Sequence, residues 1–162
     1  RLLSLVVLVC AFLVSTAPPV CAQTPDVAAL FRASGEVTSL IERAKRERKP
    51  DQANFSQPVV HLQPYTVNLE YRMAGLNATA TVHEKDVELF FVVDGAGTLV
   101  TGGTLREGRR TNPENLAGSA IDGGTPRRIG KGDVIVVPAN TPHWFTPLEG
   151  PLVLMSLHVP AP

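Results

Sequence analysis

Apolar side chains follow strand-like patterns through most of the chain. Between residues 58 and 73 they alternate with polar residues on either side of Pro64, which breaks the run, and continuous apolar runs follow at 89–93, 134–137 and 152–155. Short runs of this kind, bounded by Gly, Pro and Asp, are typical of buried or half-buried β-strands. The pattern predicts an all-β domain over residues 55–162.

A helical pattern precedes the strands. Apolar residues recur at helical spacing between Ser34 and Lys49, before Pro50 ends the pattern: Val37, Leu40, Ile41 and Ala44. A shorter helix is expected over about Asp26 to Ala33, because a threonine, a proline and an acid open it. These segments predict a helical arm at 23–54 in front of the β domain.

The first 22 residues, 1–22, have the pattern of a secretory signal peptide. A charged residue is followed by an uncharged apolar run over 2–14 and by a stretch of mostly small residues that ends at Ala22. A transmembrane anchor is the alternative, but the run is shorter than the roughly 20 residues that a bilayer requires. We therefore expect cleavage before Gln23 and an exported protein, either periplasmic or secreted.

The composition limits the metal ligands and the partners that can be expected. The two cysteines, Cys10 and Cys21, both lie in the segment that we expect to be removed, so a metal in the mature protein would have nitrogen and oxygen ligands. Fifteen Lys and Arg residues balance fifteen Asp and Glu residues, which gives no basic surface for nucleic acid. After cleavage we expect no membrane association.

A histidine and a glutamate five residues apart form the first candidate site. An odd separation places His83 and Glu88 on opposite faces of one continuous strand, unless the backbone turns between them. The charged residues 84–86 predict such a turn. We therefore expect a β-hairpin in which His83 ends one strand, Glu88 opens its antiparallel neighbour, and both side chains point into one interior.

A second stretch, 132–145, complements the first. A β-branched run lies between a Gly-Asp turn and a Pro-rich turn, and His143 begins the next strand. Together the two stretches resemble the two sequence motifs of cupins. The matching positions keep every spacing of the first motif and include three residues of the second: Gly75, His83, Glu88 and Gly95, then Gly132, Pro138 and His143.

Three positions depart from the cupin motifs. Thr81 stands where the first histidine belongs, Asn140 replaces a glycine, and Pro147 replaces the terminal asparagine. Asn tolerates positive φ better than most residues, so its substitution is mild. Thr81 removes one ligand from the usual set of three histidines and one glutamate, and the resemblance leaves His83, Glu88 and His143 as metal ligands.

The resemblance covers residues 58–160 and implies a small, single-domain cupin of the cupin 2 type. Its fold would be an antiparallel jelly-roll barrel, or double-stranded β-helix. His83, Glu88 and His143 would hold one divalent ion, for which Fe, Zn, Mn, Ni and Cu all suit the donor types. The expected function is a metal-dependent enzyme acting on a small molecule, as a dioxygenase or as an isomerase or lyase. The alternative is a metal-free, non-catalytic module that binds a small molecule, because cupins include both.

Other residues are open candidates. Tyr65, Tyr71 and His61 lie on the alternating stretch and are possible general bases, but the register around Pro64 decides which of them face inward. His158, on the last strand, is expected to be structural.

The long connection at 102–124 predicts either a functional loop or lid, or a variable barrel insertion. A further expectation concerns the strand after Glu88, because both of its faces are apolar. One face is predicted to carry Leu89, Phe91 and Val93, and the opposite face to carry Glu88, Phe90 and Val92. The outer face then needs a cover, either the helical arm or a second subunit, and cupins are often homodimers.

Overall fold

The computed structural model describes residues 30–76 and 78–162. Within them, helix α1 (Ser34–Glu47) precedes thirteen strands, and every strand pairing is antiparallel. The predicted all-β class and the main helix of the predicted arm are confirmed. The expected signal peptide at 1–22 lies outside the described residues. Within the described residues, no helix is both long and apolar enough to cross a membrane.

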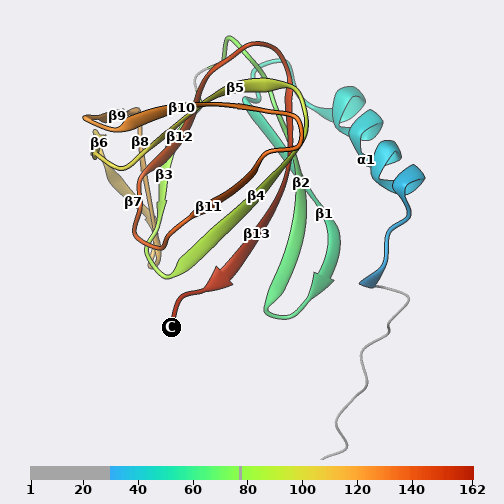
Figure 1. The fold of residues 1–162 in the computed structure, drawn as a ribbon, viewed down its shortest axis with the longest axis horizontal. Helices are drawn as coiled ribbons and strands as arrows, with labels where there is room; N and C mark the ends of the chain where they lie inside the picture. Colours follow the sequence, from blue (N-terminus) through green and yellow to red (C-terminus); the bar gives the residue numbers. More distant parts are fainter. Residues whose placement is uncertain (1–29, 77) are drawn as a thin grey trace, which may run out of the picture.

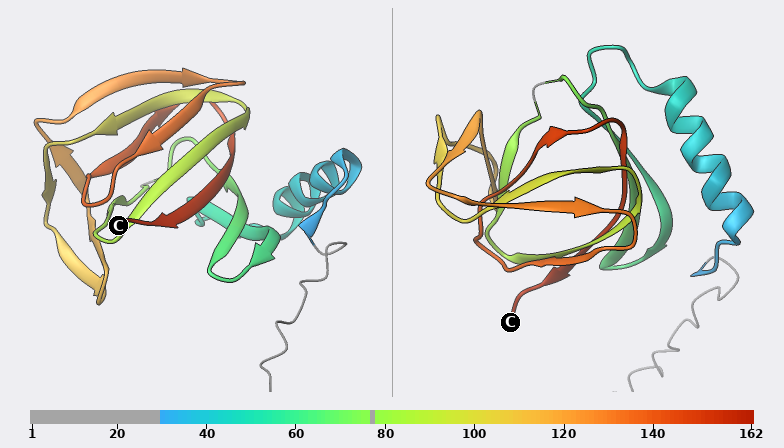
Figure 2. Two further views of the ribbon diagram at one scale, coloured as in Figure 1. Left: turned by 60° about the horizontal axis from the view of Figure 1, so that its bottom comes forward. Right: turned by 45° about the horizontal axis from the view of Figure 1, so that its top comes forward.

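Two sheets face each other (Figures 1 and 2). The first has the order β1 (Asn54–Leu62), β2 (Tyr65–Arg72), β13 (Leu152–Pro160), β4 (Asp86–Asp94) and β11 (Val134–Val137). The second has the order β10 (Thr125–Gly130), β5 (Ala96–Thr101), β12 (His143–Leu148), β3 (Ala80–His83), β8 (Asn115–Gly118) and β7 (Arg109–Asn112).

The segment expected to be a long loop is mostly regular β structure. Besides β7 and β8, it contains β6 (Thr104–Arg106) and β9 (Ala120–Asp122), which pair only with each other in a small third sheet. The β7–β8 hairpin extends the second sheet beyond β3. The alternative of a barrel insertion therefore describes residues 102–124 better than a structureless lid does.

The inner core lies between the facing sheets. It is made of eight buried side chains from both of them: Phe90, Val92, Leu99, Ile129, Val137, Phe145, Leu152 and Leu154. Phe90 of β4 and Phe145 of β12 meet edge to face, with ring centroids 5.0 Å apart. Burying each such large side chain stabilises the fold by about 1.5–3 kcal/mol, so this core fixes the distance between the two sheets.

Helix α1 covers part of the outer face of the first sheet, on the side of β1 and β2 (Figure 1). Its fully buried Ala44 packs in a second cluster with Leu69, Tyr71 and Val153. The Glu36 carboxylate accepts a hydrogen bond from the backbone N–H of Ala33 at the helix start, and such a contact stabilises a helix N-terminus. The arm was expected to cover the outer face of β4, but α1 lies over β1 and β2, so only Val93 of that face packs against this cluster.

The other half of that outer face stays exposed. The predicted faces of β4 are confirmed, since Glu88, Phe90 and Val92 are buried inside while Leu89 and Phe91 are 36% and 41% exposed. On β11, Val134 and Val136 are 64% and 58% exposed. These four outward side chains, Leu89, Phe91, Val134 and Val136, form what we call the β4–β11 patch.

One prediction about local structure is wrong. The turn after His83 is present, but β3 and β4 do not form a hairpin: β3 pairs with β12 and β8, whereas β4 pairs with β13 and β11. The chain crosses from one sheet to the other at this turn, and it crosses back at Gly95. Gly95 has φ 86°, and a Cβ there would clash with the carbonyl of Pro151. His83 and Glu88 thus approach each other across facing sheets and not within one ribbon.

Candidate metal centre

Four side chains from four strands converge at one end of the sandwich. His83 ends β3 and His143 begins β12 in the second sheet, while Glu88 lies on β4 and His158 on β13 in the first. The turn between β3 and β4 and the end of β13 lie near each other at the lower end of Figure 1.

The carboxylate of Glu88 is the centre of this group. His143 Nε2 lies 3.1 Å and His83 Nε2 3.3 Å from Glu88 Oε2. His158 Nε2 lies 3.1 Å from the other oxygen, Oε1. One donor atom each of His83, Glu88 and His158 lie within 4.8 Å of one another. Three imidazole nitrogens thus point at one carboxylate.

Burial is graded across the site. The side chains of Glu88 and His143 are only 4% and 3% exposed, that of His83 is 18% exposed and that of His158 is 34% exposed. The group is therefore most exposed on the side of His158, while the opposite side is closed by the core, where the ring centroids of His143 and Phe90 lie 6.0 Å apart.

The outer ring nitrogens of the histidines face acceptors. His83 Nδ1 lies 2.8 Å from Asn115 Oδ1, and His143 Nδ1 lies 3.2 Å from the carbonyl oxygen of Thr141. His158 Nδ1 faces Asp86 Oδ2 at 3.7 Å. A carbonyl oxygen or carboxylate beside Nδ1 favours the proton on that nitrogen, which leaves a lone pair on Nε2. We assign these tautomers from the hydrogen-bond network.

With those tautomers, Glu88 is surrounded by groups that have no proton to offer it. Glu88 Oε2 is buried and accepts no hydrogen bond, although two imidazole nitrogens lie within 3.3 Å of it. A buried polar atom without a partner is costly. A cation between the carboxylate and the imidazoles would supply the partner that Glu88 Oε2 lacks.

The electrostatics of the site also favour positive charge. Burial alone would raise the pKa of Glu88, but the contacts with His143, His158 and His83 outweigh it and hold that pKa well below its usual value. Burial alone would lower the pKa of His83, but Glu88 and Asn115 outweigh it and raise that pKa. These shifts describe the metal-free state, in which protonated imidazoles donate to an ionised Glu88 and supply its counter-charge. A bound cation would take the place of those protons, with the imidazoles then in the neutral tautomers assigned above. Imidazole nitrogens and one carboxylate suit a divalent ion such as zinc or iron, so the residues present fit a metal.

Comparison with known proteins bears on the fold alone. No family model matches the sequence, and no curated protein matches it. Among solved structures, the iron(II) form of HppE superposes with a TM-score of 0.52 at 13% identity, covering 67% of this chain. This chain spans 52% of the HppE chain, about half its length.

Two further solved structures are matched over a larger share of their own length. KdgF from Halomonas sp. has a TM-score of 0.50 at 21% identity, with 72% of this chain and 86% of that chain covered. The cupin domain of Cnp3 from Schizosaccharomyces pombe has a TM-score of 0.50 at 12% identity, with 72% of each chain covered. The chain has the cupin fold. The expectation drawn from the motif spacing is confirmed at this level.

Two departures from the cupin motifs have structural explanations. Asn140 adopts φ 58°, which suits a position where the motif carries glycine, and its N–H donates to the carbonyl of His83 over 2.7 Å. Thr81 Oγ lies 2.9 Å from His143 Nε2. The hydroxyl at the position of the missing histidine therefore donates to a histidine that the cupin motif retains.

The structure brings His83, Glu88 and His143 together, and it adds two residues that sequence reasoning missed. His158 contacts Glu88, and Asn115 of the inserted hairpin contacts His83. Alternation along β13 could have identified His158, because it lies on the same face of the strand as the buried residues Leu154 and Ser156. Asn115 had no such signal, because the insertion had no predicted position.

The three possible general bases lie elsewhere. Tyr71 packs in the cluster beneath α1, and Tyr65 is 43% exposed near the β1–β2 turn. His61 is exposed on β1 with its Nδ1 against the hydroxyl of Thr66. None of these three side chains contacts Glu88.

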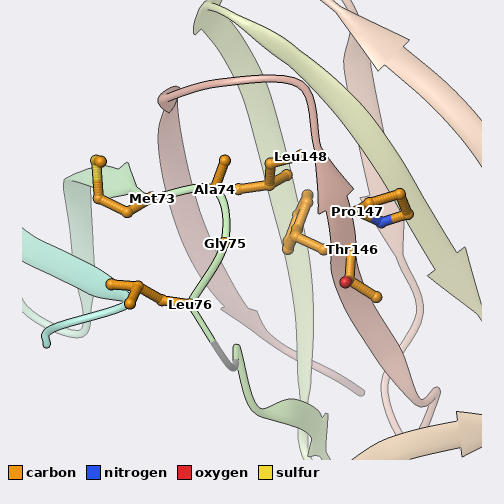
Figure 3. Close-up of a pocket in the computed structure, with 8 residues that line it drawn as sticks. Met73, Ala74, Gly75, Leu76, Thr146, Pro147 and Leu148 are labelled. Carbon is orange, nitrogen blue, oxygen red and sulfur yellow. The ribbon is translucent and has the colours of Figure 1, made fainter.

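A pocket of about 250 Å³ lies between the connection after β2 and strand β12 (Figure 3). It is lined by eight residues: Met73, Ala74, Gly75, Leu76, Phe145, Thr146, Pro147 and Leu148. None of the four converging side chains is among them. The chemistry-bearing group and this pocket are therefore separate features.

Proposed function

We propose that this protein is a metal-binding cupin that acts on a small molecule, with His83, Glu88 and His143 among the ligands. The observation that carries the proposal is the buried carboxylate of Glu88, whose oxygens face imidazole lone pairs and whose Oε2 accepts no hydrogen bond. A divalent ion bound there would supply Lewis-acid or dioxygen-activating chemistry. The reaction class that we propose is therefore that of a dioxygenase, or of an isomerase or lyase.

The chain's own residues would position and shield that site. Asn115 and the Thr141 carbonyl hold the rings of His83 and His143 with Nε2 turned inward, and such outer contacts orient metal ligands. The core behind His143 excludes water, while the exposed edge of His158 leaves an approach for substrate. A small molecule is the fitting substrate, because the converging group lies between two facing sheets and not on a broad surface.

The test is elemental analysis and metal titration of protein purified without an affinity tag. We expect near-stoichiometric binding of one divalent ion by the parent, and its loss in His83→Ala, Glu88→Ala and His143→Ala. His61→Ala is the matched control, since His61 is an exposed histidine away from the site and its replacement should leave binding intact. A parent that stays empty after incubation with iron, zinc, manganese, nickel and copper would contradict the proposal and favour a metal-free binding module.

We also propose that the protein is exported after removal of residues 1–22. The support is the sequence pattern alone, with its uncharged apolar run and the residues before Gln23. Intact-mass measurement on protein from the native host should give a chain that begins at Gln23. A chain that retains the first 22 residues would contradict export by this route.

We further propose a homodimer formed through the β4–β11 patch. Strand β11 is an edge strand of its sheet, so a second copy can cover both its free backbone edge and the exposed Val134 and Val136. Light scattering should give the mass of a dimer for the parent and of a monomer for Val136→Lys. Thr38→Lys, on an exposed position of α1, is the control and should stay dimeric. A monomeric parent would contradict the proposal.

A further inference from the structure

The last strand brings a third histidine to Glu88. In the register of β13 and β4, His158 is the direct partner of Glu88, and directly opposed side chains lie on the same face of a sheet. The chain has four histidines, and three of them have Nε2 within 3.3 Å of this one carboxylate. Such convergence from three strands is more than the packing of an ordinary strand end requires.

The compact group of donor atoms contains His158. The donor atoms of His83, Glu88 and His158 lie within 4.8 Å of one another. Two donors on the same ion are at most about 4.4 Å apart, since each bond is about 2.0–2.2 Å long. Only small side-chain adjustments would therefore let these three share an ion. The rings of His83 and His158 already meet edge to face at 4.5 Å.

His158 also has the outer contact that a ligand requires. Asp86 lies two residues before Glu88 on β4, and its Oδ2 faces His158 Nδ1 at 3.7 Å. A carboxylate behind an imidazole orients the ring and makes its inner nitrogen a better donor. The pair of Asp86 and His158 thus places a carboxylate behind the imidazole, at a longer separation than the hydrogen bond between Asn115 and His83.

We propose that His158 is a metal ligand of this centre and supplies the imidazole that Thr81 does not. The inference rests on the proposed metal-binding function. Thr81 offers a hydroxyl, which is bonded to His143 Nε2, so position 81 contributes no nitrogen. His158 restores three imidazoles and one carboxylate, with the third imidazole drawn from the last strand.

Metal affinity of His158 variants tests this inference. Full-length, tag-free protein is titrated with Co²⁺, comparing the parent with His158→Gln, His158→Ala, His83→Gln and Glu88→Gln. Loss of an outer-shell partner already weakens metal binding about 10- to 100-fold, so loss of His158 should weaken it by at least that factor. His61→Gln is the matched control and should bind as the parent does. Far-UV circular dichroism of each metal-free variant establishes that it is folded.

A second variant tests whether the imidazole at position 158 stands in for the one missing at position 81. Because Thr81 Oγ already reaches His143 Nε2, an imidazole at position 81 would enter the same group. Thr81→His combined with His158→Gln should therefore bind Co²⁺ more tightly than His158→Gln alone. If the double variant is no tighter than the single one, His158 does not stand in for position 81.

NMR of the unaltered protein tests the same role without any substitution, so it does not depend on a variant being folded. Long-range ¹H–¹⁵N spectra of the four histidines, recorded with and without Zn²⁺, report on each ring nitrogen. We expect the Nε2 resonance of His158 to shift with those of the other converging rings, while His61 stays unchanged.

The outcomes separate the two proposals. If Zn²⁺ leaves His158 unshifted and His158→Gln binds Co²⁺ as tightly as the parent, while His83→Gln and Glu88→Gln lose it, the metal centre stands and the role of His158 is overturned. If the parent binds no metal, the proposed function fails, and this inference fails with it.

Discussion

Two buried glutamates flank the last strand and are satisfied in opposite ways. Glu70 on β2 accepts hydrogen bonds from Ser156 Oγ at 2.7 Å, Arg72 Nε at 2.9 Å and Asn54 Nδ2 at 3.1 Å. Each of these partners carries a proton to donate. Glu70 is thus a closed structural ion pair with all the donors that it needs.

Glu88 on β4 is just as buried, but its partners are imidazole nitrogens whose protons face other acceptors. Its Oε2 accepts no hydrogen bond. The same strand, β13, serves both carboxylates from one face, with Ser156 at Glu70 and His158 at Glu88. Burial alone therefore does not distinguish the two carboxylates, whereas the chemistry of their neighbours does.

The largest expected effect is the loss of stability when Glu70 is replaced. Glu70→Gln leaves the guanidinium of Arg72 without its counter-charge at a site where both side chains are largely buried, 8% and 15% exposed. Breaking such a pair costs about 3 kcal/mol of the free energy of unfolding. Urea denaturation of metal-free protein measures the loss.

The control for that variant is Glu149→Gln, which breaks an exposed pair with Arg128 and should leave stability unchanged within error. Metal affinity of Glu70→Gln should equal that of the parent. If Glu70→Gln abolished metal binding in folded protein, the distinction between the two carboxylates would be wrong.

The second effect concerns Glu88, the proposed metal ligand. Saturating metal should stabilise the parent by about 2.7 kcal/mol at a hundredfold excess over Kd, because a ligand that binds only the folded state adds to its stability. Glu88→Gln should lose this increment entirely, since it removes the charge on which the donors converge. Thermal unfolding with and without Zn²⁺ measures it. An equal metal-induced rise in Tm for parent and Glu88→Gln would remove Glu88 from the centre.

A smaller effect is expected from the contact behind His83. Asn115→Ala removes the acceptor at 2.8 Å from His83 Nδ1, so the ring loses its orientation. Loss of such an outer partner weakens metal binding about tenfold, equivalent to about 1.4 kcal/mol. Competition titration with a chelator measures it. Asn112→Ala in the same hairpin is the control, and equal losses in both variants would indicate a general effect of the hairpin.

Much of the site could be predicted from local sequence. His83, Glu88 and His143 were identified because turns and apolar runs fix where strands begin and end, and Asn140 was recognised as compatible with positive φ. The faces of β4 followed from alternation. These features depend on residues close together in the chain, where spacing and turn chemistry decide the outcome.

The parts that were missed depend on pairing between distant strands. Alternation cannot tell whether β3 and β4 form a hairpin or cross between sheets, because the pattern of inward and outward residues is the same in both. His158 meets Glu88 only through the register of β13 on β4, across 70 positions in the chain. Asn115 reaches His83 because the insertion folds back onto β3.

The smallest expected effect lies at Thr81. Its hydroxyl supplies the proton that His143 Nε2 accepts at 2.9 Å, and Val has the same shape without that proton. Thr81→Val should therefore lower the stability of metal-free protein by about 1 kcal/mol, whereas Thr81→Ser, which keeps the hydroxyl, should cost less. Bound metal would take the lone pair of His143 Nε2, so the difference between Thr81→Val and the parent should shrink when Zn²⁺ is added. Urea denaturation with and without Zn²⁺ measures both quantities, and a difference that Zn²⁺ leaves unchanged would place His143 outside the metal's ligands.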